Sequence, residues 1–278
     1  MILSSSFRTF SGTSCRFRGL SGLGLFLTLS AAMTFGLGQK RYVETTPSAG
    51  SFPLAQGCRV TPIYVEVDDY PGVNRAAGDL RSDFQRVTGC RPELTHAANA
   101  LGPMAILIGT LGKSRIIDRL ARERKINTRE VSGQWEASVI QVVPHPIPGV
   151  ERALVIAGSD KRGTIYGIYD LSEQIGVSPW YWWADVPVAH KDALYVKVGT
   201  YVMSQPAVKY RGIFLNDEAP SLAGWATEKF GGFNHLFYEK VFELLLRLKA
   251  NYLWPAMGAA PSTKTILSIP GSPTNTAS

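Results

Sequence analysis

The chain has 278 residues, of which 45% are hydrophobic and 18% are charged, and its mean hydropathy is +0.01. This composition excludes a disordered polyampholyte and a protein with many membrane spans. The formal net charge is +7, but residues 1–41 hold five basic residues and no acidic one, which leaves 24 basic and 22 acidic residues in the rest. The body of the protein is nearly neutral, which argues against a nucleic-acid partner.

Residues 1–38 have the pattern of a secretory signal peptide. Three arginines precede an apolar run from Leu20 to Leu37, and small residues suited to cleavage lie between Ala31 and Gly38. We therefore expect a secreted, extracellular protein with no stable membrane association after cleavage. Two alternatives stay open: a single membrane anchor, because about 18 apolar residues is the lower limit for a span, and a mitochondrial presequence, because the segment is rich in Ser and Arg.

Cleavage would remove Cys15 and leave Cys58 and Cys90. Cys58 precedes a predicted strand at Ile63–Val67, and Cys90 follows a predicted helix from Val73 to Val87. A helix that returns along the strand before it brings these thiols close together. A disulfide and two free buried thiols are both consistent with this pattern.

Residues 58–200 read as one mixed α/β domain with helices packed on a sheet. Apolar runs bounded by turn residues predict its strands, and apolar residues at three- and four-residue steps predict its helices. The further strands are expected at Met104–Ile108, Ser138–Val143, Ala153–Ala157 and Leu194–Val198, and the further helices at 116–120 and 164–175.

The turn before the third helix contains Asp160, Lys161 and Arg162 between two glycines. Backbone amides at a helix start, together with two cations, form a site for an anion such as a carboxylate. An ordinary solvated turn has the same residue types. Further along, Trp180, Tyr181, Trp182 and Trp183 are nearly contiguous, which indicates either a ligand cleft or packing at a domain junction.

From Pro206 the pattern changes to a strand at Val208–Leu215, a polar linker, a helix at Phe237–Ala250 and a strand at Asn251–Trp254. This is the β–α–β step of a parallel (β/α)8 barrel, in which ligand groups lie at the carboxyl ends of strands. Asn216, Asp217, Glu218 and Trp254 fall at such ends. Carboxylates there suit glycoside hydrolysis, although adjacent strand residues point to opposite faces, so Asp217 and Glu218 are not expected to form the acid/base pair by themselves.

The segment YRGIFLNDEAPSLAGWATEKFGGFNHLFYEKVFELLLRLKANYLWPAM resembles the first barrel segment of glycoside hydrolase family 115, the xylan α-1,2-glucuronidases. The upstream SDKRGTIYGIYDLSEQIGVSPWYWWADVPV resembles the N-terminal domain of that family. The resemblance covers about 200 residues, from Cys58 to Met257. It implies metal-independent, inverting release of glucuronic acid or 4-O-methyl-glucuronic acid from xylan side chains.

The resemblance also implies roles for single residues. Asn216, Asp217 and Glu218 match the polar cluster of the family's active site, with Asp217 and Glu218 as catalytic candidates, and Trp254 matches an aromatic residue at the second strand end. Lys161 and Arg162 match a loop of the N-terminal domain, where we expect them to bind the uronate carboxylate. The implied partner is glucuronoxylan or an acidic xylo-oligosaccharide, and no cofactor or metal is expected, since the four histidines lack ligand spacing.

The chain departs from the family pattern at its end. We expect residues 206–257 to begin a barrel that needs six further strands, and residues 258–278 to be a disordered tail rich in Ser, Thr, Pro and Gly. A truncated, inactive fragment is therefore the expected form, and a non-catalytic binding module for acidic xylan is the alternative. Without barrel neighbours, the helix Phe237–Ala250 would expose an apolar face made of Val241, Phe242, Leu244, Leu245 and Leu248.

Overall fold

The computed structural model describes residues 40–255. The expected signal peptide at residues 1–38, with its two alternatives, and the expected tail at residues 258–278 lie outside this range. Within residues 40–255, no helix combines the length and the apolar character that crossing a bilayer requires.

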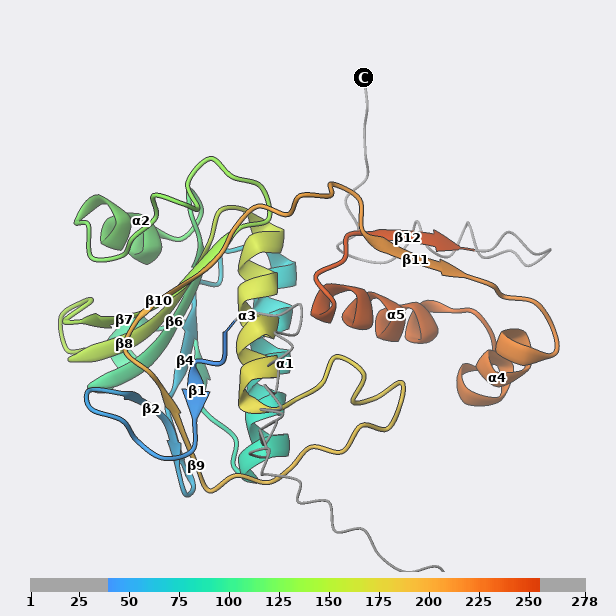
Figure 1. Cartoon of the computed structure of the whole chain (residues 1–278), viewed down its shortest axis with the longest axis horizontal. Helices are drawn as coiled ribbons and strands as arrows, with labels where there is room; N and C mark the ends of the chain where they lie inside the picture. The colour runs from blue at the N-terminus through green and yellow to red at the C-terminus, as the bar shows by residue number, and fades with distance from the viewer. Residues whose placement is uncertain (1–39, 256–278) are drawn as a thin grey trace, which may run out of the picture. The chain divides into compact units, whose positions relative to one another are not determined.

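A six-stranded sheet organises the first part of the described chain (Figure 1). Its strand order is β10 (Thr200–Met203), β7 (Ser138–Pro144), β8 (Arg152–Gly158), β6 (Met104–Thr110), β4 (Ile63–Val65) and β5 (Leu94–Thr95). The last four strands are parallel, and β7 and β10 complete the sheet in antiparallel pairs. The predicted strands at residues 63, 104, 138 and 153 are therefore confirmed within two residues at each end.

Helices cover both faces of this sheet because its inner strands are apolar on both sides. Helices α1 (Pro71–Thr88) and α3 (Lys161–Ile175) pack on the face that includes Ile106 and Ile108. Helix α2 (Arg115–Arg122) packs on the other face, with Leu107. Figure 1 shows α2 on the opposite side of the sheet from α1 and α3.

A second sheet joins β1 (Val43–Glu44), β9 (Ala193–Val196), β2 (Phe52–Gln56) and β3 (Arg59–Val60) in that order. Strand β2 was not expected because it contains Pro53, which cannot donate to a strand ladder. The structure accommodates this residue at a register shift between Pro53 and Ala55. Cys58, in the β2–β3 turn, forms a disulfide with Cys90, just after α1, so of the two alternatives the structure contains the bridge.

The last described elements form a parallel β–α–β unit. Strand β11 (Gly212–Leu215) pairs in parallel with β12 (Tyr252–Pro255), and α5 (His235–Arg247) lies between them in the chain. The segment predicted as a polar linker contains an additional helix, α4 (Ser221–Phe230), which ends at Gly231 in a left-handed conformation. The strand–helix–strand order predicted from Val208 onward is confirmed.

The expectation of an uncovered apolar face on α5 is wrong. Val241, Leu244 and Leu245 are buried, and α5 packs on β11, β12 and α4 and also meets α3. Of the five apolar residues on that face, Leu248 remains exposed, at 37%. The cover comes mainly from β11, β12 and α4 of the same unit, and Trp183 and α3 of the α/β domain add to it.

Candidate functional site at the carboxyl ends of β11 and β12

The two parallel strands present different faces, as the two-residue period of a strand requires. Ile213, Leu215 and Leu253 pack into the apolar cluster around α4 and α5. Phe214 and Trp254, which are register partners, lie on the opposite face. Each is 59% exposed, and their rings meet edge to face with centroids 6.0 Å apart. The unit therefore has one covered face and one open aromatic face.

The polar cluster predicted from the sequence follows β11 directly. Asn216 and Glu218 are exposed, like Phe214, and Asp217 between them is half-buried. Asp217 and Glu218 therefore differ in exposure, and the expectation that they do not form the acid/base pair by themselves stays a prediction. Trp254 lies at the same end of the strand pair, so the structure brings it to the end of the sheet at which the polar cluster begins.

One oxygen of Asp217 is distinctive. Its Oδ1 atom is inaccessible to solvent and has no hydrogen-bond partner among the described residues. A buried carboxylate oxygen without a donor is costly, and such groups in native structures call for an explanation such as a catalytic role. The structure thus distinguishes Asp217 from its two neighbours, whose side chains are open to solvent.

The opposite, amino-terminal ends of β11 and β12 hold a separate polar cluster around Glu136. This side chain is 3% exposed, and its Oε2 accepts a hydrogen bond of 2.5 Å from Arg211 Nη2. Its Oε1 accepts from Asn251 Nδ2 at 2.9 Å and from Arg162 Nη1 at 3.4 Å. Arg211 and Asn251 directly precede the two strands, so Glu136 fixes the start of the strand pair to the α/β domain.

The expected uronate site at Lys161 and Arg162 needs correction at Arg162. Both residues lie in the first turn of α3 rather than in a loop, and Asp160 caps this helix by accepting from Gly163 N at 2.8 Å. Arg162 pairs with Glu136. Carboxylates of the chain itself therefore occupy the place expected for a ligand at Arg162 and at the start of α3, whereas the role expected for Lys161 stays a prediction. Since Arg211 and Asn216 are five strand steps apart, roughly 16 Å, this end does not join the cluster at Asn216 in one site.

Replacement of Glu136 by glutamine is expected to lower the free energy of unfolding by about 2–3 kcal/mol, because two guanidinium groups lose their shared buried anion. Urea titration followed by tryptophan fluorescence measures the change. Glu130 is an exposed glutamate of the same loop, so Glu130→Gln is the matched control and should change stability by less than about 0.5 kcal/mol. Equal effects of the two substitutions would show that the Glu136 cluster does not fix the strand pair.

The tryptophan cluster forms packing between chain segments. Trp182 and Trp183 contact Trp225, at ring-centroid distances of 6.2 and 5.6 Å. Trp183 also meets Phe237 edge to face and donates from Nε1 to the carbonyl of Lys240 at 3.1 Å. Of the two alternatives for this cluster, junction packing is the one the structure contains. The described residues also include no group of three or more His, Cys, Asp or Glu side chains that could hold a metal ion.

Comparison with known proteins places this geometry in a family. The model of glycosyl hydrolase family 115 matches residues 203–271, which include the cluster at Asn216 and Trp254. A solved family 115 4-O-methyl-α-glucuronidase, with specificity for decorated arabinogalactans, is 34% identical over 74% of this chain, with a TM-score of 0.61. The chain belongs to glycoside hydrolase family 115.

This family 115 chain spans about a quarter of its solved relative, 26% of that enzyme's length. Two further structures are less similar: a Streptomyces plicatus β-hexosaminidase (14% identity, 78% of this chain and 33% of that one, TM-score 0.43) and a Vibrio harveyi exo-β-N-acetylglucosaminidase (14%, 80% and 25%, TM-score 0.40). Neither bears on the family assignment. No curated protein sequence matches the chain.

The family 115 chain also contains contacts and exposed residues near the candidate site that sequence patterns did not reveal. Phe214 was missed as an exposed residue because it lies within the apolar run of β11, although it is two residues from Asn216 and so shares its face. The partners of Glu136 were missed because Arg211 follows it by 75 residues. Asp160 did carry a signal, since an aspartate directly before a helix is a preferred N-cap.

Proposed function

We propose that this chain is part of an α-glucuronidase that hydrolyses glucuronic acid or 4-O-methyl-glucuronic acid side chains of xylan. The observation that carries the proposal is its 34% identity to a solved 4-O-methyl-α-glucuronidase over 74% of the chain. That relative is specific for decorated arabinogalactans, so arabinogalactan is the polymer to compare with xylan in any assay. The resemblance of the sequence to xylan glucuronidases is the reason for putting xylan first.

In this proposal β11 and β12 are the first two strands of a (β/α)8 barrel. Three observations support it: the strands are parallel, helices α4 and α5 cover one face, and a polar cluster follows the carboxyl end of β11. Barrel helices lie outside the strands, and active sites lie at the carboxyl ends. The open face with Phe214 and Trp254 would then point into the barrel.

The roles of the cluster follow from its placement. Trp254 offers an exposed ring for stacking on a sugar, and Asn216 offers an amide for its hydroxyl groups. The buried, unpartnered Oδ1 of Asp217 suits a carboxylate that gains its donor when substrate binds. Inverting hydrolysis needs two carboxyl groups about 6.5–9.5 Å apart, so one of Asp217 and Glu218 would act with a carboxylate from a further strand.

A chimera tests this function. Residues 40–255 replace the matching quarter of the solved family 115 enzyme, so that the contacts of Glu136 and α5 with the α/β domain are transferred together with the strands. We expect the folded chimera to release glucuronate from glucuronoxylan, and proton NMR to detect the β anomer first, because inversion of an α linkage gives β. A folded chimera with no release would contradict the proposal, and α anomer first would contradict inversion.

The 278-residue chain alone is expected to release no uronic acid above background, because its described residues supply two of the eight strands that close a barrel. A reducing-end or uronic acid assay with glucuronoxylan and arabinogalactan measures this. Clear turnover by the chain alone would show that the barrel of this proposal is not required for the chemistry.

A further inference from the structure

The near neutrality of the chain body hides one strongly basic segment. Residues 113–125, which contain α2, hold six basic and two acidic residues, a net charge of +4. The remainder of residues 42–278 holds 18 basic and 20 acidic residues, a net charge of −2. Positive charge is therefore concentrated around one helix, where it raises the local concentration of anions.

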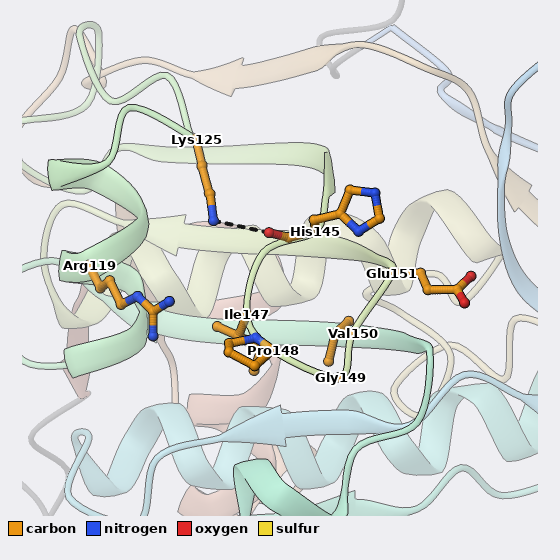
Figure 2. A pocket seen from close by; sticks show the side chains of 8 residues that line it. All are labelled: Arg119, Lys125, His145, Ile147, Pro148, Gly149, Val150 and Glu151. Atoms are coloured by element: carbon orange, nitrogen blue, oxygen red, sulfur yellow. Dashed lines mark hydrogen bonds between the residues drawn. The ribbon is translucent and has the colours of Figure 1, made fainter.

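A hollow of about 420 Å³ lies between this segment and the loop that joins β7 to β8. Its apolar lining comes from the loop, chiefly Ile147, Pro148 and Val150, and its cationic side chains are Arg119 and Lys125 (Figure 2). In Figure 2 the Arg119 side chain reaches from α2 toward Ile147 and Pro148. A volume of this size accommodates one or two sugar rings.

The two cations differ in how they are held. Lys125 Nζ donates to the carbonyls of His145 and Pro146, at 3.0 and 3.3 Å, so its charge is fixed over the loop. Arg119 is held through Nε, which donates to Glu123 at 2.8 Å. Its two terminal nitrogens donate to no other described residue, so the planar fork that binds carboxylates in bidentate fashion stays available.

The acidic residues of the region do not close the hollow to an anion. Glu123 lies outside the residues that line it and serves to hold Arg119 and Lys125, at 2.8 and 3.0 Å. The carboxylate of Glu151, which is part of the lining, points away from the other labelled side chains in Figure 2. The imidazole of His145, which also lines the hollow, lies above Pro148 and Val150 in Figure 2.

We propose that this hollow is a binding site for a uronate residue of an acidic polysaccharide, with Arg119 on the carboxylate and the Ile147–Pro148 surface under the sugar ring. The choice of a uronate rests on the proposed function. A nucleic-acid partner is less suited, because no Phe, Tyr or Trp side chain lines the hollow for base stacking.

This site is separate from the strand-end cluster. Ile147, Val150 and α2 belong to the apolar cluster on one face of the six-stranded sheet, whereas α5 meets α3 on the other face. A polysaccharide held here would be anchored to the α/β domain without occupying the residues proposed to hydrolyse it. Such a second contact raises the effective concentration of substrate at the first.

Calorimetry with the 278-residue chain and 4-O-methylglucuronoxylan tests the proposal. We expect the double variant Arg119→Ala/Lys125→Ala to bind about tenfold more weakly or worse, since the contact of Arg119 with the carboxylate and the nearby positive charge of Lys125 are both lost. The same polymer with its carboxyl groups chemically reduced should also bind at least about tenfold more weakly. Because Lys125 holds the loop, Arg119→Gln provides a second variant that leaves Lys125 in place, and its affinity should fall in the same direction.

The matched control is Arg59→Ala/Arg91→Ala, which removes two exposed charges outside α2 and the β7–β8 loop and should leave affinity within about twofold. Unchanged binding by Arg119→Gln and the double variant would overturn the proposal, as would equal binding of carboxyl-reduced xylan. If single-stranded DNA binds as tightly as glucuronoxylan, the result would contradict a uronate site and indicate a surface that binds polyanions in general. None of these readouts requires hydrolysis, so they can succeed where the proposed glucuronidase activity fails, or fail where it succeeds.

Discussion

Arg247→Ala is expected to lower the free energy of unfolding by about 3 kcal/mol. Arg247, on α5, has a side chain that is 2% exposed and binds Asp83 of α1 through Nη1 at 2.9 Å and Nη2 at 3.2 Å. Removing one partner of a buried ion pair costs about 3–5 kcal/mol. Arg86 remains 2.7 Å from Asp83, which places the expected loss at the lower end of this range.

The surroundings of Arg247 add to this expectation. Its guanidinium lies 4.7 and 4.9 Å from the ring centroids of Tyr169 and Tyr181, and its Nε donates to Glu243 at 2.9 Å. Burial acts to raise the pKa of Glu243, but the charges of Arg247 and Lys240 and the hydrogen bond from Tyr181 lower it below its ordinary value. The carboxylate of Glu243 therefore stays charged, and the cluster binds α5 to the α/β domain.

Arg75→Ala is the matched control for this prediction. Arg75 also joins α1 to α5, through Glu239, but both side chains are about half exposed, at 52% and 42%. An exposed pair contributes about 0–1 kcal/mol. Chemical denaturation of both variants measures the difference, and a loss below about 1 kcal/mol for Arg247→Ala would show that the buried cluster does not hold α5 in place.

Loss of the Cys58–Cys90 disulfide is expected to cost about 3–4 kcal/mol. The bridge spans 32 residues, and a cross-link over a loop of this length removes about that much conformational freedom from the unfolded chain. Cys58→Ser/Cys90→Ser should therefore unfold at markedly lower denaturant concentration than the oxidised chain, and the oxidised chain should approach the variant when reductant is added.

Alkylation and mass spectrometry provide the independent check on this bridge. Without reductant, neither Cys58 nor Cys90 should be modified; with reductant in denaturant, both should be. Cys15→Ser is the control for loss of a thiol elsewhere. Two alkylatable thiols in the folded chain without reductant, or equal stability of the double variant and the oxidised chain, would contradict the prediction.

The parts of the fold that the sequence predicted are those with long, regular apolar patterns. Strands β6, β7 and β8 and helices α1 and α3 bury several consecutive or regularly spaced apolar residues, so periodicity located them within a few residues. Strand β2 was missed because Pro53 disrupts the strand pattern, and α4 because Gly224 and the glycines after Phe230 resemble a linker. Short elements of this kind are stabilised by tertiary contacts, which the local propensities of the residues do not predict.

The candidate site divides in the same way. The sequence could place four of the candidate residues at strand ends, because the position of each depends only on where one strand ends: Asn216, Asp217, Glu218 and Trp254. The error at Arg162 arose from contacts between distant segments: Arg162 meets Glu136, 26 residues away, and Glu136 meets Arg211, 75 residues away. Spacing along the chain carries no information on such pairs, so a cationic turn and a structural ion pair could not be told apart.

The central claim is that the polar cluster after β11 belongs to a glucuronate-hydrolysing site. The most direct measurement is kcat for glucuronate release by the chimera that contains residues 40–255, compared with its Asp217→Asn and Glu218→Gln variants. We expect at least one of the two to lower kcat by about a hundredfold or more, as loss of a general acid or base does, while Glu130→Gln leaves it unchanged. Full activity in both variants, with the chimera folded, would contradict the claim.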